Sequence, residues 1–127
     1  MASPKTDVGI ELHVPDLKKA VDFYSILGFK VESLDEGYLV MRKGRGIVNF
    51  FQSEEGYSHS YFGKFPKETK RGYAVEIIFF EDDVGEFYEK IRDKVKIAGA
   101  LRARPWGRDF RVEDPFGFYL RFGEKKH

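Results

Sequence analysis

At 127 residues the chain has room for one domain of ordinary size and not for two. Hydrophobic residues make up 42% and aromatic residues 17%, which supplies a core and excludes a mainly disordered chain. With a net charge of +1, no general attraction to nucleic acid or to an anionic membrane is expected. The absence of cysteine excludes disulfide frameworks, thiolate nucleophiles and cysteine-ligated metals. No segment is apolar for long enough to predict a membrane span or a signal peptide, so a cytoplasmic location is expected.

The first half of the chain predicts one strand, one helix and three further strands. A β-prone run over 8–14 is followed by Asp16, a residue suited to cap a helix that begins near Leu17. Apolar residues then recur at helical spacing, and Gly28 is suited to end the helix in a left-handed conformation. The three strands that follow are expected over 29–34, 38–42 and 47–52.

The second half repeats this order after a connection over 53–71, which is polar and has no sustained periodicity. A strand is expected over 73–80. Asp83 and Glu86 then form a capping box at the start of a helix with one apolar face. The last three strands are expected over 96–101, 108–112 and 118–122.

This internal repeat predicts an α+β fold of two tandem βαβββ modules. A single domain over 1–127 would contain module one at about 7–52 and module two at about 72–123. Neither helix has enough strands in its own module to bury its apolar face, so the modules are expected to pack together. Two curved sheets around a cleft are a usual place for a small ligand.

Several motifs carry a resemblance to a known family. They are Val14-Pro15-Asp16-Leu17 followed by Phe23-Tyr24, then Leu27-Gly28-Phe29, and Asp114-Pro115-Phe116-Gly117 before an apolar strand. Together, over essentially the whole chain, they resemble the vicinal oxygen chelate superfamily, also called the glyoxalase/bleomycin resistance/dioxygenase superfamily. The segment Arg104-Pro105-Trp106-Gly107-Arg108-Asp109-Phe110, ahead of Asp114-Pro115, is similar to the bleomycin resistance protein branch.

Enzymes of this superfamily bind one divalent metal through His, Glu or Gln side chains on the inner faces of the sheets. The resemblance places the corresponding positions of this chain at Gly9, Asn49, Arg121 and, on or near it, Ala74. None of these is a good ligand, and a guanidinium group would repel a cation. We therefore expect no metal, no cofactor and no catalytic residue, and a binding protein rather than an enzyme.

Two other interpretations concern the acidic residues near these positions. Glu11, His13 and Glu76 lie two or four residues further along the same strand faces, which allows a displaced metal site in a glyoxalase- or dioxygenase-type enzyme. Alternatively, Glu11 and Glu76 are ion-pair partners of Arg121 or Arg108 near the cleft, since buried charges need pairing.

Strand alternation and the resemblance together predict which side chains contact a ligand. The predicted ligand-binding residues are Glu11, Asn49, Phe51, Tyr61, Glu76, Trp106, Arg108, Phe110, Tyr119 and Arg121, with Tyr57 and Phe62 as further aromatic residues of the loop. Flat aromatic rings and a few charges suit a planar or elongated organic ligand. For Phe51 and Phe110 the alternative is a place in the core.

Bleomycin resistance proteins are metal-free dimers that sequester their ligand, with exchanged N-terminal strands and two clefts at the interface. The resemblance implies a homodimer that sequesters an antibiotic or a toxic aromatic compound. Bleomycin is cationic, whereas Arg108 and Arg121 are expected in the cleft of this near-neutral chain, so a neutral or anionic aromatic compound fits the charge better. An accessory domain without a ligand is a further alternative.

Overall fold

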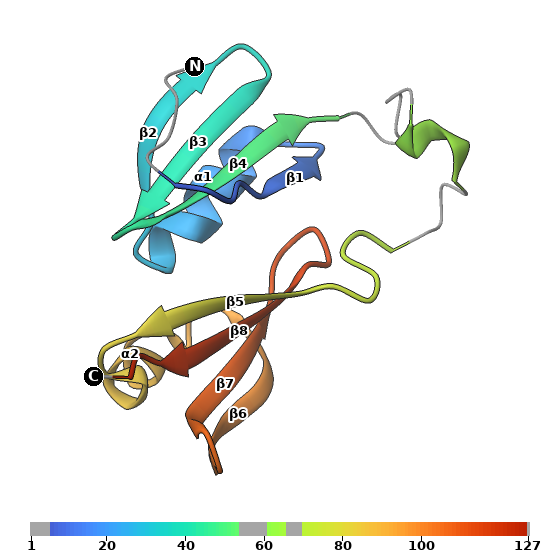
Figure 1. The fold of residues 1–127 in the computed structure, drawn as a ribbon. Helices are drawn as coiled ribbons and strands as arrows, with labels where there is room; N and C mark the ends of the chain where they lie inside the picture. The colour runs from blue at the N-terminus through green and yellow to red at the C-terminus, as the bar shows by residue number, and fades with distance from the viewer. Residues whose placement is uncertain (1–5, 54–60, 66–69, 127) are drawn as a thin grey trace. The chain divides into compact units, whose positions relative to one another are not determined.

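A computed structural model describes residues 6–53, 61–65 and 70–126 of the chain. The chain divides into two compact units, unit 1 over residues 1–69 and unit 2 over residues 70–127. In each unit a strand, a helix and three more strands build a four-stranded mixed sheet with the helix against one of its faces (Figure 1). The predicted α+β fold of two βαβββ modules is therefore confirmed.

Unit 1 is built around a sheet in the strand order β1-β4-β3-β2. Strand β1 runs parallel to β4, and the other neighbouring pairs are antiparallel. Its elements are β1 (Glu11–Val14), α1 (Leu17–Ile26), β2 (Lys30–Asp35), β3 (Tyr38–Lys43), β4 (Gly46–Gln52) and a short 3₁₀ helix, η1 (Phe62–Lys64).

Both ends of α1 follow the sequence prediction. The Asp16 side chain accepts a hydrogen bond from the backbone N–H of Lys19 at 3.0 Å, which satisfies one of the free donors of the first turn. Gly28 follows the helix with a φ of 95°, and Nζ of Lys43 donates to the Leu27 carbonyl oxygen at 2.7 Å. The buried face of the helix places Tyr24 in the core of unit 1.

We expect Gly28→Ala to lower the free energy of unfolding by about 1 kcal/mol, because a side chain disfavours the left-handed backbone that ends α1. Chemical denaturation followed by circular dichroism measures the change. Gly46→Ala is the matched control: Gly46 has no such backbone angle, and an added Cβ would meet only an ordinary contact, 3.5 Å from the Lys43 carbonyl oxygen. Equal losses in the two variants would contradict the expectation.

Unit 2 repeats the arrangement with a sheet in the order β5-β8-β7-β6. Strand β5 runs parallel to β8, while β8, β7 and β6 pair in antiparallel fashion. Its elements are β5 (Glu76–Glu81), α2 (Val84–Ile91), β6 (Lys96–Arg104), β7 (Gly107–Glu113) and β8 (Tyr119–Glu124).

A core of aromatic rings joins α2 to its sheet. Asp83 caps the helix by accepting from the backbone N–H of Glu86 at 3.0 Å, as predicted. The ring of Phe110 on β7 stacks on Phe122 of β8, with centroids 5.2 Å apart, and lies 4.9 Å from the ring of Tyr88 on α2. The apolar side of this sheet is thus the side that faces α2.

The first strand of each unit is shorter than the sequence predicts, and β6 is longer. Strand β5 begins at Glu76 rather than at residue 73, because Ala74 has a φ of 61° and Val75 donates a turn hydrogen bond to Gly72. Strand β6 continues to Arg104, where it pairs with Gly107 across the turn into β7. Of the predicted connection over 53–71, residues 54–60 and 66–69 lie outside the described part of the chain.

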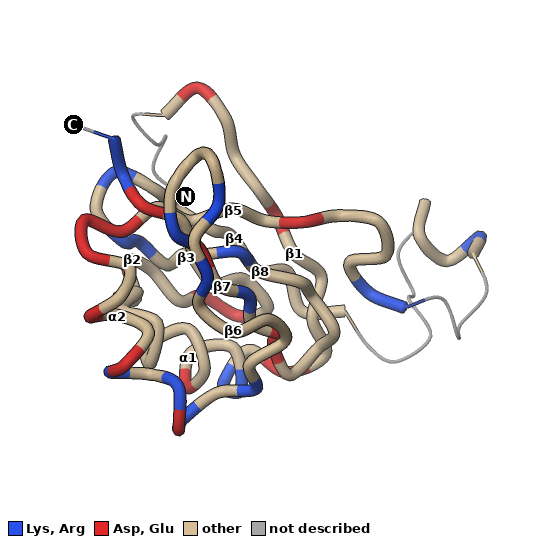
Figure 2. The backbone as a smooth tube through the Cα atoms, turned by 90° about the horizontal axis from the view of Figure 1, so that it is seen from below, with Lys and Arg blue, Asp and Glu red and all other residues tan. Residues whose placement is uncertain are grey.

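Charged residues of both signs occur in both units (Figure 2). Across the residues placed by the structure, neither helix is long and apolar enough to cross a membrane.

Candidate functional site

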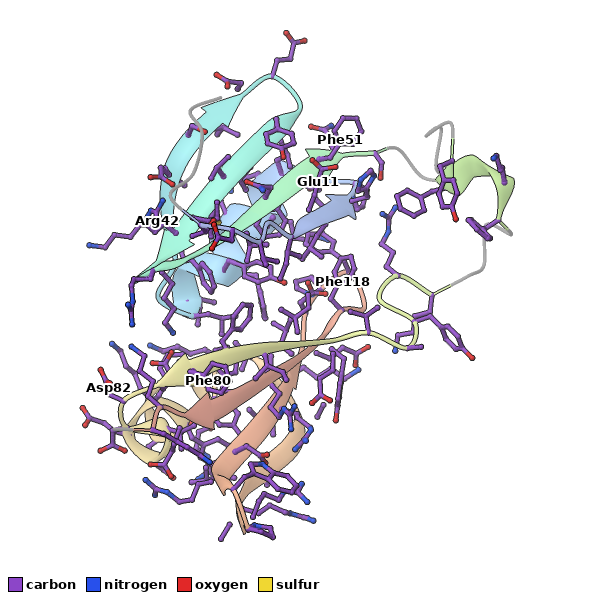
Figure 3. All side chains as sticks on the ribbon, viewed as in Figure 1. Glu11, Arg42, Phe51, Phe80, Asp82 and Phe118 are labelled. Atoms are coloured by element: carbon purple, nitrogen blue, oxygen red, sulfur yellow. The ribbon has the colours of Figure 1, made fainter. Side chains whose placement is uncertain are left out.

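The face of the unit 1 sheet opposite α1 carries polar and aromatic side chains. We call it polar face 1 and define it by Glu11, His13, Tyr38, Asn49 and Phe51. The register places Glu11 beside Asn49 and His13 beside Phe51, and Phe51 beside Tyr38 on its other side. Because side chains alternate along a strand, these five point to one side of the sheet, while Phe50 points to the other side and packs against Tyr24 of α1. Glu11 and Phe51 are labelled on β1 and β4 in Figure 3.

A carboxylate stands at the centre of polar face 1. Oε1 of Glu11 accepts a hydrogen bond from the Tyr38 hydroxyl at 2.7 Å, and Oε2 lies 3.1 Å from Nε2 of His13. The His13 ring is buried, with the rings of Phe51 and Phe62 each at 5.0 Å between centroids. Among the described residues of unit 1, the partners of Glu11 are thus Tyr38 and His13. Tyr38 is a member of the group that the sequence analysis missed.

Burial and the neighbouring Glu11 carboxylate, which accepts its hydrogen bond, raise the pKa of Tyr38 to about 12. We expect Glu11→Gln to lower this pKa toward the ordinary value of about 10, because the negative charge that disfavours the phenolate is gone. Alkaline titration of the phenolate absorbance, with Tyr38→Phe to identify the signal of Tyr38, measures the change. Glu32→Gln, which removes a carboxylate paired with Arg42 in the same sheet, is the control and should leave the Tyr38 signal in place.

The same rise sets a direction for stability at high pH. A tyrosine whose pKa is higher in the folded than in the unfolded state contributes stability below the unfolded pKa, and this contribution is lost as pH rises from about 10 toward 12. The loss of stability at high pH should be smaller in Tyr38→Phe than in wild type. An identical loss in both proteins would contradict the assignment of this effect to Tyr38.

The corresponding face of the unit 2 sheet, opposite α2, is more strongly charged. We call it polar face 2 and define it by Glu76, Asp109, Arg111, Tyr119 and Arg121. The register places Tyr119 beside Glu76 on one side and beside Glu113 on the other, and it places Arg121 directly opposite Arg111. Side chains one position away, among them Phe110 and Phe122, point toward α2.

Ion pairs connect most of polar face 2. Oε1 of Glu76 lies 3.1 Å from Nε of Arg111 and 3.3 Å from Nε of Arg121. Nη1 of Arg111 also donates to Asp109 at 3.0 Å, and Nε of Arg104 donates to the same oxygen of Asp109 at 3.3 Å. The expected pair between Glu76 and Arg121 is present, and Arg111 is a second partner that the sequence analysis did not name.

Asp109 fixes the predicted tryptophan at the edge of polar face 2. Its Oδ2 accepts a hydrogen bond from the indole N–H of Trp106 at 3.3 Å, while Trp106 as a residue remains 54% exposed. Burial by itself would raise the pKa of Asp109. Hydrogen bonds from Trp106 and Arg104 and the charges of Arg111 and Arg104 outweigh burial, so this pKa lies below its usual range.

The predicted face is wrong for two of the proposed ligand-binding residues. Phe110 is fully buried in the core of unit 2, which was its alternative interpretation. Arg108 is on the same side of β7 as Phe110, where Nε and Nη2 bind the Glu124 carboxylate at 3.0 and 3.2 Å and Nη2 lies 3.7 Å from Asp83. The odd-numbered residues of β7 point to polar face 2 instead.

The other predicted residues fall into two groups. Glu11, Asn49 and Phe51 lie on polar face 1; Glu76, Tyr119 and Arg121 lie on polar face 2, with Trp106 attached through Asp109. Tyr61 contacts Phe62 at 5.3 Å, and Phe62 in turn contacts His13. Tyr57 lies outside the described residues.

The side chains at the metal positions that the resemblance implies do not fit a divalent cation. Gly9 offers no side-chain donor, Asn49 only a neutral amide, and Ala74 only a methyl group in a turn. The fourth position is the Arg121 guanidinium, and the neighbouring Glu76 carboxylate is already shared by two arginines. Within residues 6–53, 61–65 and 70–126, no group of three or more His, Cys, Asp or Glu side chains is arranged to hold a metal.

Comparisons with known proteins place this geometry in context. A family model described as "Glyoxalase/Bleomycin resistance protein/Dioxygenase superfamily" matches residues 8–122. No curated protein matches the chain. Solved structures with the same fold include a bleomycin-binding protein complexed with bleomycin, at 21% identity and a TM-score of 0.67, with 96% of this chain and 100% of the other covered.

Two further solved structures show how varied proteins of this fold are. A bleomycin resistance determinant encoded on the transposon Tn5 is 21% identical with a TM-score of 0.69, covering 97% of this chain and 100% of its own. Lactoylglutathione lyase from Agrobacterium tumefaciens is 20% identical with a TM-score of 0.66, covering 97% and 96%. A binding protein and an enzyme are about equally similar to the chain, so similarity of fold does not distinguish between these functions. The distinction has to be argued from the side chains of the two polar faces.

Proposed function

The chain belongs to the Glyoxalase/Bleomycin resistance protein/Dioxygenase superfamily, and on that premise we propose that it binds a small organic molecule and acts by sequestering it, without a metal. The observation that carries this proposal is Trp106. Its indole N–H is held by the buried Asp109 carboxylate while the side chain stays largely exposed. A fixed, exposed aromatic ring beside partly buried charges is suited to stacking on a planar ligand and orienting it.

The donor chemistry supports binding rather than metal-assisted catalysis. Superfamily enzymes need several carboxylate or imidazole ligands, whereas polar face 2 offers guanidinium groups around its two carboxylates. We further propose that the ligand is an antibiotic or a toxic aromatic compound in the cytoplasm, and that the protein is a homodimer with ligand sites at its interface. A bleomycin-binding protein of the same fold supports a role in binding.

Fluorescence of Trp106 tests this proposal directly, because it is the only tryptophan of the chain. The protein is titrated with a panel of aromatic compounds that includes bleomycin. We expect a saturable change at about one ligand per chain for at least one compound, with that compound recovered unchanged by mass spectrometry. The variant Trp106→Phe should lose the signal, and calorimetry of this variant then measures what the indole ring contributes to affinity.

Elemental analysis separates this proposal from the enzyme alternative. The protein is incubated with manganese, iron, nickel and zinc and then dialysed. Metal contents near zero for all four agree with sequestration. About one metal per chain, or conversion of a bound compound to a product, would contradict it and return attention to Glu11, His13 and Glu76.

A further inference from the structure

Arg104 pairs with Asp109 from outside polar face 2, and with it this group of ion pairs has three guanidinium groups and two carboxylates. Among the residues that the structure describes, the ion-pair partners of Arg104, Arg111 and Arg121 are the carboxylates of Glu76 and Asp109. Asp109 is 1% exposed, and the side chains of Arg111 and Arg121 are 16% and 22% exposed. A partly desolvated cation without a full counter-charge is costly, so this group of side chains favours an additional anion.

Arg121 has the weakest protein partner of the three. It lies directly opposite Arg111 across the β7–β8 ladder, where like charges repel. Glu76 relieves this repulsion with a single oxygen, Oε1, which lies near Nε of both arginines. In the part of the chain that the structure describes, Nε of Arg121 makes no hydrogen bond although it is buried and 3.3 Å from that oxygen. The guanidinium group of Arg121 is therefore the group best placed to bind the anionic group of a ligand.

An aliphatic and an aromatic side chain lie next to Arg121, one on the neighbouring strand β5 and one on β8 itself. Ile78 is its register partner on β5, and Tyr119 is two residues before it on β8, so all three point to the same side of the sheet. Both Ile78 and Tyr119 are exposed. A ligand whose anionic group binds Arg121 would therefore place a flat apolar part against these two side chains.

We propose that polar face 2 recognises an aromatic carboxylic acid, with the carboxylate on Arg121 and the ring against Ile78 and Tyr119. This inference rests on the proposed function and adds the charge class of the ligand. Arg111 stays occupied by Asp109 and Glu76 and holds the positive potential around the site. Glu76 competes with the ligand for Arg121, so it acts as an internal counter-ion that a stronger carboxylate partner displaces.

A charge series of one aromatic ring tests the proposal. Naphthoate, naphthamide and naphthylmethylamine share the ring and differ in charge. We expect naphthoate to bind about tenfold to a hundredfold more tightly than naphthamide, because a charge-assisted hydrogen bond to a guanidinium group contributes a factor of about this size to affinity. Rising salt should weaken naphthoate binding and leave naphthamide binding nearly unchanged. Equal or tighter binding of naphthamide or naphthylmethylamine overturns the proposal.

Variants identify the residue responsible. Arg121→Gln should lose the preference for naphthoate while it keeps the affinity for naphthamide, and Arg121→Lys should retain part of the preference because it keeps the charge without the fork. The control Arg92→Gln removes an exposed arginine that pairs with Glu89 near the end of α2, and it should change nothing. A naphthoate preference that survives intact in Arg121→Gln overturns the assignment to Arg121.

The variant Glu76→Gln gives a result that does not depend on loss of function. Removing the internal counter-ion should tighten naphthoate binding several-fold, whereas a purely structural role for Glu76 would weaken it. Weaker binding therefore counts against the proposal. If no compound of the panel binds, the proposed function itself fails; if naphthamide, naphthylmethylamine or bleomycin binds and naphthoate does not, only the charge class is wrong.

Discussion

Phe110→Ala is expected to lower the free energy of unfolding by about 3–5 kcal/mol, because it removes a large side chain from the centre of a packed core. Phe110 has no exposed surface, and its ring contacts those of Phe122, Tyr88 and Phe87 at 5.2, 4.9 and 6.1 Å. The space left behind lies between β7, β8 and α2, three elements that cannot all move to close it. Urea denaturation followed by circular dichroism measures the loss.

The matched control is Phe80→Ala, which deletes the same side chain from β5 of the same unit. Phe80 is 57% exposed and is labelled on β5 in Figure 3. Its removal should cost less than about 1 kcal/mol. If Phe80→Ala proved as costly as Phe110→Ala, or if Phe110→Ala changed ligand affinity without changing stability, the placement of Phe110 in the core would be wrong.

The parts of the fold that sequence could predict are those fixed by local chemistry. Asp16 and Asp83 each precede an amphipathic helix and cap it as predicted, and Gly28 has the left-handed backbone that its position suggested. Repetition of the same local signals in both halves was enough to predict two βαβββ modules. The same reasoning gave too early a start for β5, because nothing local distinguishes Ala74 in a turn from Ala74 in a strand.

The error at β7 concerns which face of the strand is buried. Phe110 and Val112 are apolar and Asp109 and Arg111 are charged, which favours burial of the first pair. The register is set by the turn that begins at Asp114, where the backbone N–H of Asp114 donates to the Phe118 carbonyl oxygen. Counting outward from that turn places Arg111 beside Arg121, so Arg111 rather than Phe110 belongs with Arg121.

Contacts between distant segments were beyond the sequence. The hydrogen bond from Tyr38 to Glu11 joins residues of β1 and β3, which are separated by β4. No spacing rule predicts that a tyrosine at the start of one strand reaches a carboxylate two strands away. The two polar faces also differ in charge although their modules repeat, since Glu11 meets a tyrosine and a histidine where Glu76 meets two arginines. Similar backbones thus present different chemistry.

Asp109→Asn is the second substitution with a large expected effect, a loss of about 3–5 kcal/mol at neutral pH. The carboxylate is almost fully buried and accepts hydrogen bonds from Arg104, Arg111 and Trp106. An amide of the same size keeps only one acceptor oxygen and no charge, so Arg104 and Arg111 lose the negative charge that pairs them. If the amide oxygen takes the place of Oδ1, the Trp106 N–H faces an NH2 group instead of an acceptor. Removing one side of a buried ion pair costs more than the pair contributes, because the remaining charge stays desolvated.

The pH dependence of unfolding separates this loss of charge from a packing defect. The pKa of Asp109 is lower in the folded protein than its ordinary value of about 3.9, so its contribution is fully present above that value and is lost as pH falls toward the folded pKa. The difference in free energy of unfolding between wild type and Asp109→Asn should therefore be constant near neutral pH and shrink below about pH 4. Asp93→Asn, at an exposed position after α2, is the control and should follow wild type. A difference that persists unchanged into acid would mean that Asp109 stabilises the fold through its shape and not through the charge that balances Arg104 and Arg111.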